Sequence, residues 1–157
     1  MRAITIAAVL LPLAACGETE TKTPEVEAVA KSADGYEIAV TNIQVGSKVD
    51  DNGLVPEASA GELYVLITYS LTNTGDAQQT MGNWPEVLLI DQEGNEYERD
   101  LFASSALSSF ANSSWAAPLS PDLSTSVTAV WKVSDSRFDR STWKVKFAST
   151  PEVTFGL

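Results

Sequence analysis

The chain has 157 residues, with 10 basic and 21 acidic side chains that give a formal net charge of -11. The absence of histidine and the presence of one cysteine exclude Ser-His-Asp and Cys-His nucleophile systems, an internal disulfide and nearly every zinc or copper site. The acidic excess argues against a nucleic-acid partner, which requires a clustered basic face.

Residues 1–16 have the character of an export signal. Met1-Arg2 is a short positive start, and residues 3–13 form an apolar run too short for the roughly 20 residues that cross a bilayer as a helix. The run ends in Leu13-Ala14-Ala15-Cys16, which resembles the lipobox of bacterial lipoproteins. The resemblance implies that residues 1–15 are a signal peptide and that Cys16 is the lipidated first residue of the mature protein.

The lipobox resemblance also implies a location. It predicts a protein anchored in the bacterial cell envelope through the lipid on Cys16, and Gly17 in place of aspartate favours the outer membrane, facing the periplasm. Several acyl chains hold a protein on a bilayer durably. The alternative is a secreted protein in which Cys16 is coincidental. Removal of residues 1–15 takes away Arg2 and leaves nine basic against 21 acidic residues, a net charge of -12.

Residues 16–34 are expected to be the lipidated N-terminus that the resemblance implies, followed by a flexible linker, because residues 18–27 are polar, acidic and nearly free of apolar side chains. Residues 35–157 are expected to form one domain. Alternating apolar side chains predict strands over 36–45, 63–73, 125–133 and 143–147, with further strands at 87–90, 96–102 and 153–155. A phase slip at Thr41-Asn42 indicates a bulge or a strand that changes sheets.

Turn signals separate these strands, and no convincing long helix is expected. Asp50-Asp51-Asn52-Gly53 carries the strongest hairpin signal, whereas residues 103–118 show no clear period. The economical fold is an all-β, antiparallel, immunoglobulin-like β-sandwich of about seven or eight strands.

The order of turns and strands is similar to a known family. Asn73-Thr74-Gly75-Asp76, residues 87–97 and Pro118-Leu119-Ser120-Pro121-Asp122 resemble the immunoglobulin-like domains of the DUF4352 and telomeric-repeat-binding-factor-like group over residues 36–149. That group is found in bacterial lipoproteins and cell-surface proteins. The resemblance implies a fold and no catalytic residues.

Two segments are candidate sites. Asp91, Glu93 and Asn95 alternate around Gly94 and are candidate calcium ligands, although a solvated hairpin explains them equally and no metal is favoured. Phe110 and Trp115 lie in the irregular stretch 103–117, which is either a contact surface or a loop covering the core. Trp131 and Trp143 are in phase with apolar neighbours and are assigned to the core.

No catalytic site is indicated. The acidic side chains show no pair suited to glycoside hydrolysis, and the serines near 104–114 lack a Gly-x-Ser-x-Gly elbow. The sequence therefore predicts a non-catalytic envelope protein without a cofactor, acting through an envelope protein partner or as structural support. A small-ligand or calcium-dependent binding module, or an accessory subunit of an envelope enzyme or secretion system, is the alternative.

Overall fold

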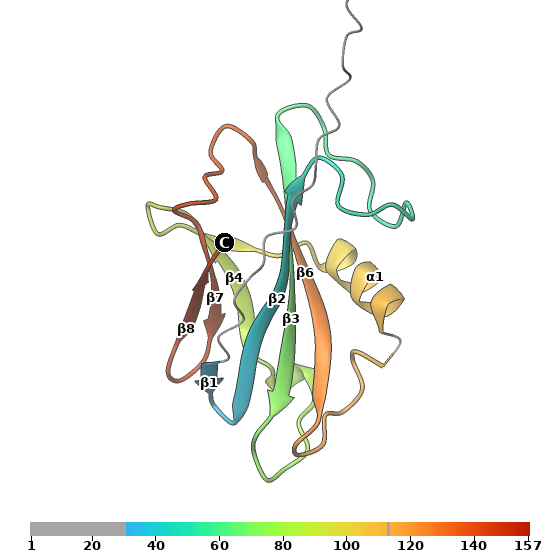
Figure 1. The fold of residues 1–157 in the computed structure, drawn as a ribbon, viewed down its shortest axis with the longest axis vertical. Helices are drawn as coiled ribbons and strands as arrows, with labels where there is room; N and C mark the ends of the chain where they lie inside the picture. The colour runs from blue at the N-terminus through green and yellow to red at the C-terminus, as the bar shows by residue number, and fades with distance from the viewer. Residues whose placement is uncertain (1–30, 113) are drawn as a thin grey trace, which may run out of the picture.

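The computed structural model describes residues 31–112 and 114–157, which form two antiparallel four-stranded sheets with one α-helix beside them (Figure 1). The first sheet has the strand order β1-β2-β3-β6 and the second β5-β4-β7-β8. The elements are β1 Lys31–Ala33, β2 Tyr36–Gly46, β3 Glu62–Asn73, the 3-10 helix η1 Met81–Asn83, β4 Glu86–Ile90, β5 Glu96–Glu98, α1 Leu101–Ala111, β6 Ser124–Ser134, β7 Lys144–Ala148 and β8 Val153–Gly156. The predicted all-β sandwich is confirmed.

Inward-facing side chains of both sheets fill the space between them. On β3 the alternating residues are all buried, as predicted: Leu63, Val65, Ile67, Tyr69 and Leu71. Trp131 and Trp143 are likewise fully enclosed, which confirms their assignment to the core. The Trp131 Nε1–H crosses the sandwich and donates to the carbonyl oxygen of Tyr97 at 2.9 Å. This bond links β6 of the first sheet to β5 of the second.

The phase slip in β2 is a β-bulge. The register with β3 shifts between Val40 and Asn42, and pairing resumes at Asn42 opposite Thr68. The extra residue turns Ile43 into the core, where it is almost completely buried. The strand stays in one sheet over its whole length.

The hairpin at the start of the domain corrects the predicted extent of the linker. Lys31–Ala33 pairs with Tyr36–Ile38, so the folded domain begins four residues earlier than residue 35. Asp34 and Gly35 form the two-residue connection, with φ angles of 46° and 78°. Asp-Gly is among the residue pairs that tolerate these left-handed angles best.

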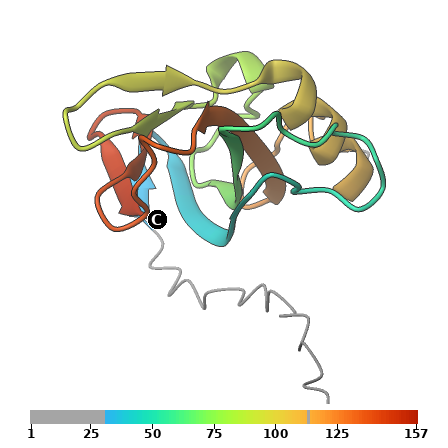
Figure 2. The ribbon, with the colours of Figure 1, turned by 90° about the horizontal axis from the view of Figure 1, so that it is seen from above.

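The Asn52-Gly53 signal lies inside a longer connection. Residues 47–61 join β2 to β3, and the Asp50 carboxylate organises this loop by accepting hydrogen bonds from the backbone N–H groups of Asn52, Leu54 and Val55. Figure 2 shows the loop on the same side of the molecule as α1. Val55 packs there with Tyr64 on the outer face of the first sheet.

The helix α1 contradicts the prediction that residues 96–102 continue as a strand into an irregular segment. β5 ends at Glu98, and α1 begins after Asp100, whose carboxylate caps the helix by accepting the Ala103 N–H at 2.9 Å. No helix in residues 31–112 and 114–157 is long and apolar enough to cross a membrane. The predicted signal peptide, Cys16 as the predicted lipidation site and most of the predicted linker lie outside the described residues.

Candidate functional site

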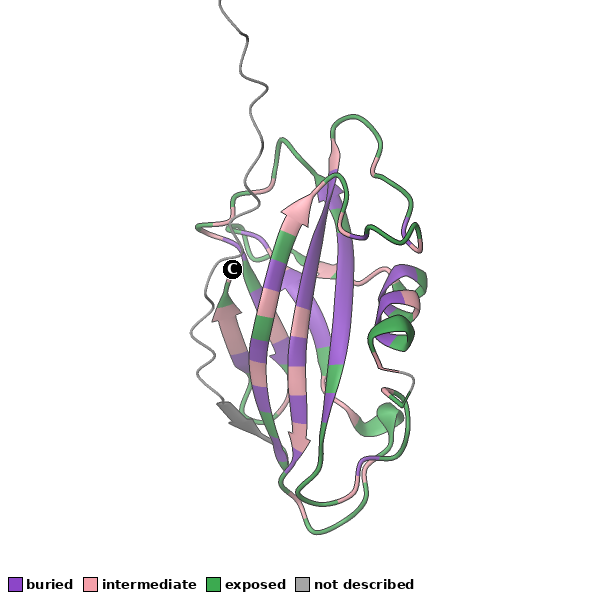
Figure 3. Ribbon diagram, turned by 45° about the vertical axis from the view of Figure 1, so that its right-hand side comes forward, coloured by how far each residue is buried: buried purple, intermediate pink, exposed green. Residues whose placement is uncertain are grey.

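Serine hydroxyls hold the inner face of α1 against the free edge of β6. Figure 3 shows buried residues on the side of α1 that faces β6 and exposed residues on the opposite side. β6 is the last strand of its sheet, so alternate backbone groups on its outer side have no strand partner. The Ser104 hydroxyl accepts the Val130 N–H at 2.9 Å, and the Ser108 hydroxyl accepts the Thr128 N–H at 2.9 Å. The Asp100 N–H donates to the Val130 carbonyl at 2.7 Å. Asp100 and the serines of α1 therefore make the hydrogen bonds with β6 that a fifth strand would otherwise make at this edge.

The outer face of α1 carries the large apolar side chains. Phe102 is 77% exposed and Phe110 is 65% exposed, while Leu101, at the first position of the helix and 66% exposed, lines the cleft described below. Phe102 and Phe110 are eight residues apart, so they lie on the same side of the helix, about 12 Å apart along its axis. The helix thus buries Ala103, Ser104, Leu107 and Ser108 and presents both phenylalanines to solvent.

The two residues nominated as a contact surface therefore have different environments. Phe110 stands out from α1, whereas Trp115 is half-buried and packs against the main core. The Trp115 Nε1–H donates to the Ser109 hydroxyl at 2.8 Å, which fixes the indole beside the end of the helix. Phe110 fits a contact surface, and Trp115 belongs to the wall of a cleft.

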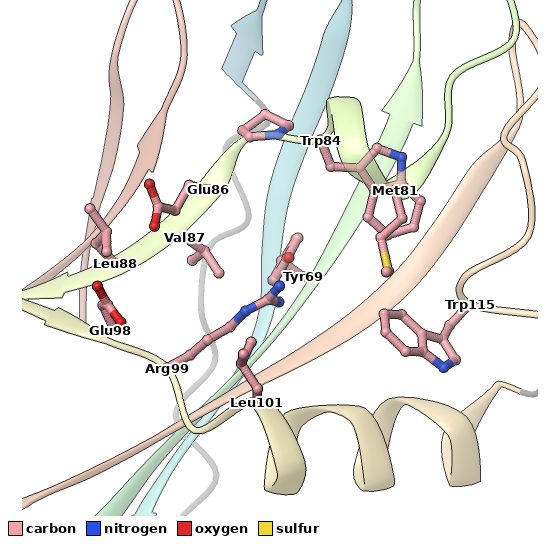
Figure 4. A pocket seen from close by; sticks show the side chains of 11 residues that line it. Tyr69, Met81, Trp84, Glu86, Val87, Leu88, Glu98, Arg99, Leu101 and Trp115 are labelled. Carbon is pink, nitrogen blue, oxygen red and sulfur yellow. The ribbon is translucent and has the colours of Figure 1, made fainter.

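This cleft has a volume of about 390 Å³ and opens between the two sheets (Figure 4). Its apolar walls come from η1, the start of β4 and the segment after α1, and include Met81, Trp84, Val87 and Trp115. Trp84 packs against the core just before β4, as expected for a side chain at a strand entrance. The cleft brings together aromatic side chains that are 31 residues apart in the sequence.

Arg99 and Tyr69 are the polar groups at the floor of the cleft. Figure 4 shows the Arg99 guanidinium directed towards the Tyr69 hydroxyl, with Glu86 and Glu98 at the side. Burial raises the pKa of Tyr69 to about 12, although the positive charge of Arg99 acts in the opposite direction. The sequence did not indicate either residue as part of a site. Tyr69 has the position of an ordinary apolar residue in the alternating pattern of its strand. The only signal at Arg99 was one cation within the acidic stretch 96–100.

The acidic hairpin has an internal structural role. Asp91 is 7% exposed, and its carboxylate accepts hydrogen bonds from the N–H groups of Glu93 and Asn95, the Asn95 side-chain amide and the Tyr97 hydroxyl. Burial raises the pKa of Asp91, but these hydrogen bonds outweigh it and the net shift is downward. Glu93 and Asn95 are exposed. The described residues contain no group of three acidic or cysteine side chains placed to hold a metal ion.

Comparisons with known proteins show the fold. The chain is 26% identical over 116 residues to the uncharacterized protein YxkC of Bacillus subtilis, a match that covers 72% of this chain and 64% of that protein. The chain thus spans less than two thirds of the length of this relative. No protein-family model matches the chain.

Two solved structures have the same architecture. A conserved hypothetical protein from Bacillus anthracis superimposes with a TM-score of 0.64 at 19% identity, over 80% of this chain and 85% of that one. An uncharacterized β-sandwich protein from Clostridium difficile 630 gives a TM-score of 0.55 at 13% identity, over 85% and 92% of the two chains. The second of these supports the description of this domain as a β-sandwich.

Proposed function

We propose that the protein is a non-catalytic, lipid-anchored component of the bacterial cell envelope that binds a protein partner through the outer face of α1. The anchor is proposed at Cys16, on the basis of the lipobox-like sequence, and the outer membrane facing the periplasm is the proposed location. The observation that carries the binding function is the exposed pair Phe102 and Phe110 on a helix whose other face is already satisfied.

The composition of α1 favours a protein partner over a lipid surface. Leu101–Ala111 contains no charged residue, although the chain as a whole carries a net charge of -11. Amphipathic helices that lie on anionic membranes carry lysine or arginine on the polar face, which this helix lacks. Interface cores, in contrast, are depleted of charge and enriched in aromatic side chains. A partner with a matching uncharged, apolar patch fits these properties.

The anchor is tested by intact mass and membrane partitioning of the native protein beside a Cys16→Ala variant. We expect the native protein to carry the mass of its acyl chains and to need detergent for extraction. The variant is expected to lose both properties. An unmodified, soluble native product would contradict the proposed anchor and would indicate a free periplasmic or secreted protein.

The binding face is tested by photocrosslinking in intact envelopes. A photoreactive residue at position 102 is expected to yield a discrete adduct, while the same residue at the exposed Gln92, on the distant acidic hairpin, is the matched control. A photoreactive residue at Ala106, between the two phenylalanines on α1, is expected to give an adduct as well. The double variant Phe102→Ser/Phe110→Ser is expected to abolish this adduct without lowering the thermal unfolding temperature. A large loss of stability in this variant would show that the phenylalanines serve the fold, and equal adducts from positions 102 and 92 would also contradict the proposal.

A further inference from the structure

The Arg99 guanidinium lies inside the cleft and has no partner among the described residues. No ion pair or hydrogen bond joins Arg99 to any residue of 31–112 or 114–157, while Lys48, Lys132 and Lys146 all pair with carboxylates. Glu86 and Glu98 line the same cleft, but neither carboxylate is within ion-pair distance of the Arg99 guanidinium. Arg99 is only half-exposed, so its donors are turned towards the cleft.

Tyr69 provides a second and independent unpartnered group. Its side chain is 97% buried, as its residual exposure is 3%, and its ring packs edge-on against Phe147 with the centroids 4.8 Å apart. Its hydroxyl makes no hydrogen bond in the part of the chain that the structure describes. The oxygen itself is not fully enclosed, so it can donate to water or to a ligand in the cleft. The buried donor of the cleft wall that has no partner in the described residues is the Trp84 Nε1–H. Because burial raises the pKa of Tyr69 to about 12, this hydroxyl stays protonated, as a donor, even in mildly alkaline solution.

The surroundings of this pair restrict what can bind. A guanidinium presents two parallel N–H donors that match the two oxygens of a carboxylate, and a phenol adds a third donor. Glu86 and Glu98 disfavour a ligand with a second negative charge. Met81, Trp84 and Trp115 offer apolar surface to the rest of the ligand.

We propose that the cleft binds a single carboxylate group attached to an apolar body, with Arg99 and Tyr69 donating to the carboxylate and the tryptophans covering the apolar part. Either a small organic acid or the C-terminus of a peptide has this chemistry. The site is separate from the phenylalanine face of α1 and does not depend on the partner proposed there.

The direct test compares two probes of the same size and apolar body, one ending in a carboxylate and the other in the uncharged amide. The full chain, in micelles of an uncharged detergent, is titrated with 3-phenylpropionate and with 3-phenylpropionamide. Tryptophan fluorescence and the indole N–H signals of Trp84 and Trp115 report occupancy. We expect the carboxylate to bind at least about tenfold more tightly than the amide, the ratio typical of charge-assisted hydrogen bonds. Equal affinities, or no binding of either probe, would overturn the proposal.

Three variants assign the effect to the cleft. Arg99→Gln is expected to make the two probes bind equally, whereas Arg140→Gln, which removes the same charge from the loop between β6 and β7, should keep the preference. Tyr69→Phe retains the ring and is expected to weaken binding of the carboxylate by about threefold or more. Phe102→Ser is expected to change neither affinity. This variant therefore separates the carboxylate site in the cleft from the protein contact proposed on α1, and either proposal can be contradicted without the other. A preference that survives Arg99→Gln would overturn the site.

A second pair of probes separates the two sources of the carboxylate. Acetyl-Ala-Ala-Phe with a free C-terminus is compared with the same peptide as its amide. Binding of the free peptide as tight as that of 3-phenylpropionate supports recognition of a peptide terminus. Exclusion of the peptide while 3-phenylpropionate still binds supports a small acid. In either case the binding should be lost in Arg99→Gln, and either result agrees with the proposed carboxylate site.

Discussion

The Asp91 carboxylate is the most heavily hydrogen-bonded acidic group of the hairpin that joins β4 to β5. Its downward-shifted pKa means that the folded state binds the proton of this group less tightly than the unfolded state does. The resulting stabilisation is fully present above the ordinary aspartate pKa, near 4, and is lost as the pH falls through the lower folded value.

We expect Asp91→Asn to lower the midpoint of urea unfolding at pH 7 and to have a progressively smaller effect as the pH falls below about 4. The reason is that protonation removes the same charge-assisted hydrogen bonds that the substitution removes. Tyr97→Phe, which deletes one of these hydrogen bonds, should give a weaker version of the same pH dependence. A difference from the native protein that stays constant from pH 7 to pH 3 would contradict this account.

Residue patterns alone could not decide what these oxygen atoms bind. Asp91, Glu93 and Asn95 alternate as calcium ligands do, and they also have the spacing of an Asx turn. In the structure Asp91 points inward to Asn95 and Tyr97, while Glu93 points to solvent. The direction of a side chain in a tight turn depends on backbone angles, such as the φ of 84° at Gly94, that spacing does not determine.

The helix α1 was not predictable from apolar periodicity for an identifiable reason. A surface helix normally places its apolar residues on the buried face, and here Phe102 and Phe110 are on the other one. The buried face consists of Ala103, Ser104, Leu107 and Ser108. The long strands, in contrast, were predicted well, because on β3 the buried residues other than Asn73 are also the apolar ones. The only helix signal in the sequence was Asp100 at the N-cap.

The serine contacts of α1 are testable. Ser104→Ala and Ser108→Ala each leave a β6 N–H group without its partner, and each should lower the free energy of unfolding by about 1–3 kcal/mol. Ser105→Ala, at an exposed position of the same helix, is the matched control and should be neutral or slightly stabilising. Urea unfolding gives these values.

The same variants test the role of α1 at the sheet edge. An uncovered edge strand can pair with another chain, so the double variant Ser104→Ala/Ser108→Ala should form oligomers or aggregates at lower protein concentration than Ser105→Ala. Analytical sedimentation distinguishes the two. If both remain monomeric and equally stable, the serine hydroxyls do not hold the helix on β6.

At the scale of the whole molecule, alternating strands with turn signals every few residues restrict the fold to an antiparallel sandwich, which is what the structure contains. The alternation of apolar residues could not predict the cleft between the two sheets, because it does not determine how their ends pack together. The cleft depends on Arg99 and Trp115, which flank a helix that the patterns did not reveal. The likeness of residues 36–149 to the DUF4352 group stays a prediction.

The hydrogen bond between the Trp131 indole and the Tyr97 carbonyl couples the two sheets, and a pair of identical substitutions isolates its contribution. Trp131 and Trp143 are both fully enclosed, but the Trp143 Nε1–H has no hydrogen-bond partner in the described residues. Replacing either indole by phenylalanine removes a similar volume. Only Trp131→Phe also leaves the half-buried Tyr97 carbonyl without its donor.

We therefore expect Trp131→Phe to destabilise the protein by about 1–2 kcal/mol more than Trp143→Phe, on top of the cavity cost that the two share. Hydrogen exchange should show where the difference arises. In the Trp131 variant, backbone amides of β5 are expected to exchange faster than those of β3, because the short strand β5 loses its tie to the opposite sheet. Equal destabilisation by the two substitutions would mean that apolar packing alone joins the sheets, and that the edge of the cleft next to Arg99 gains no rigidity from this bond.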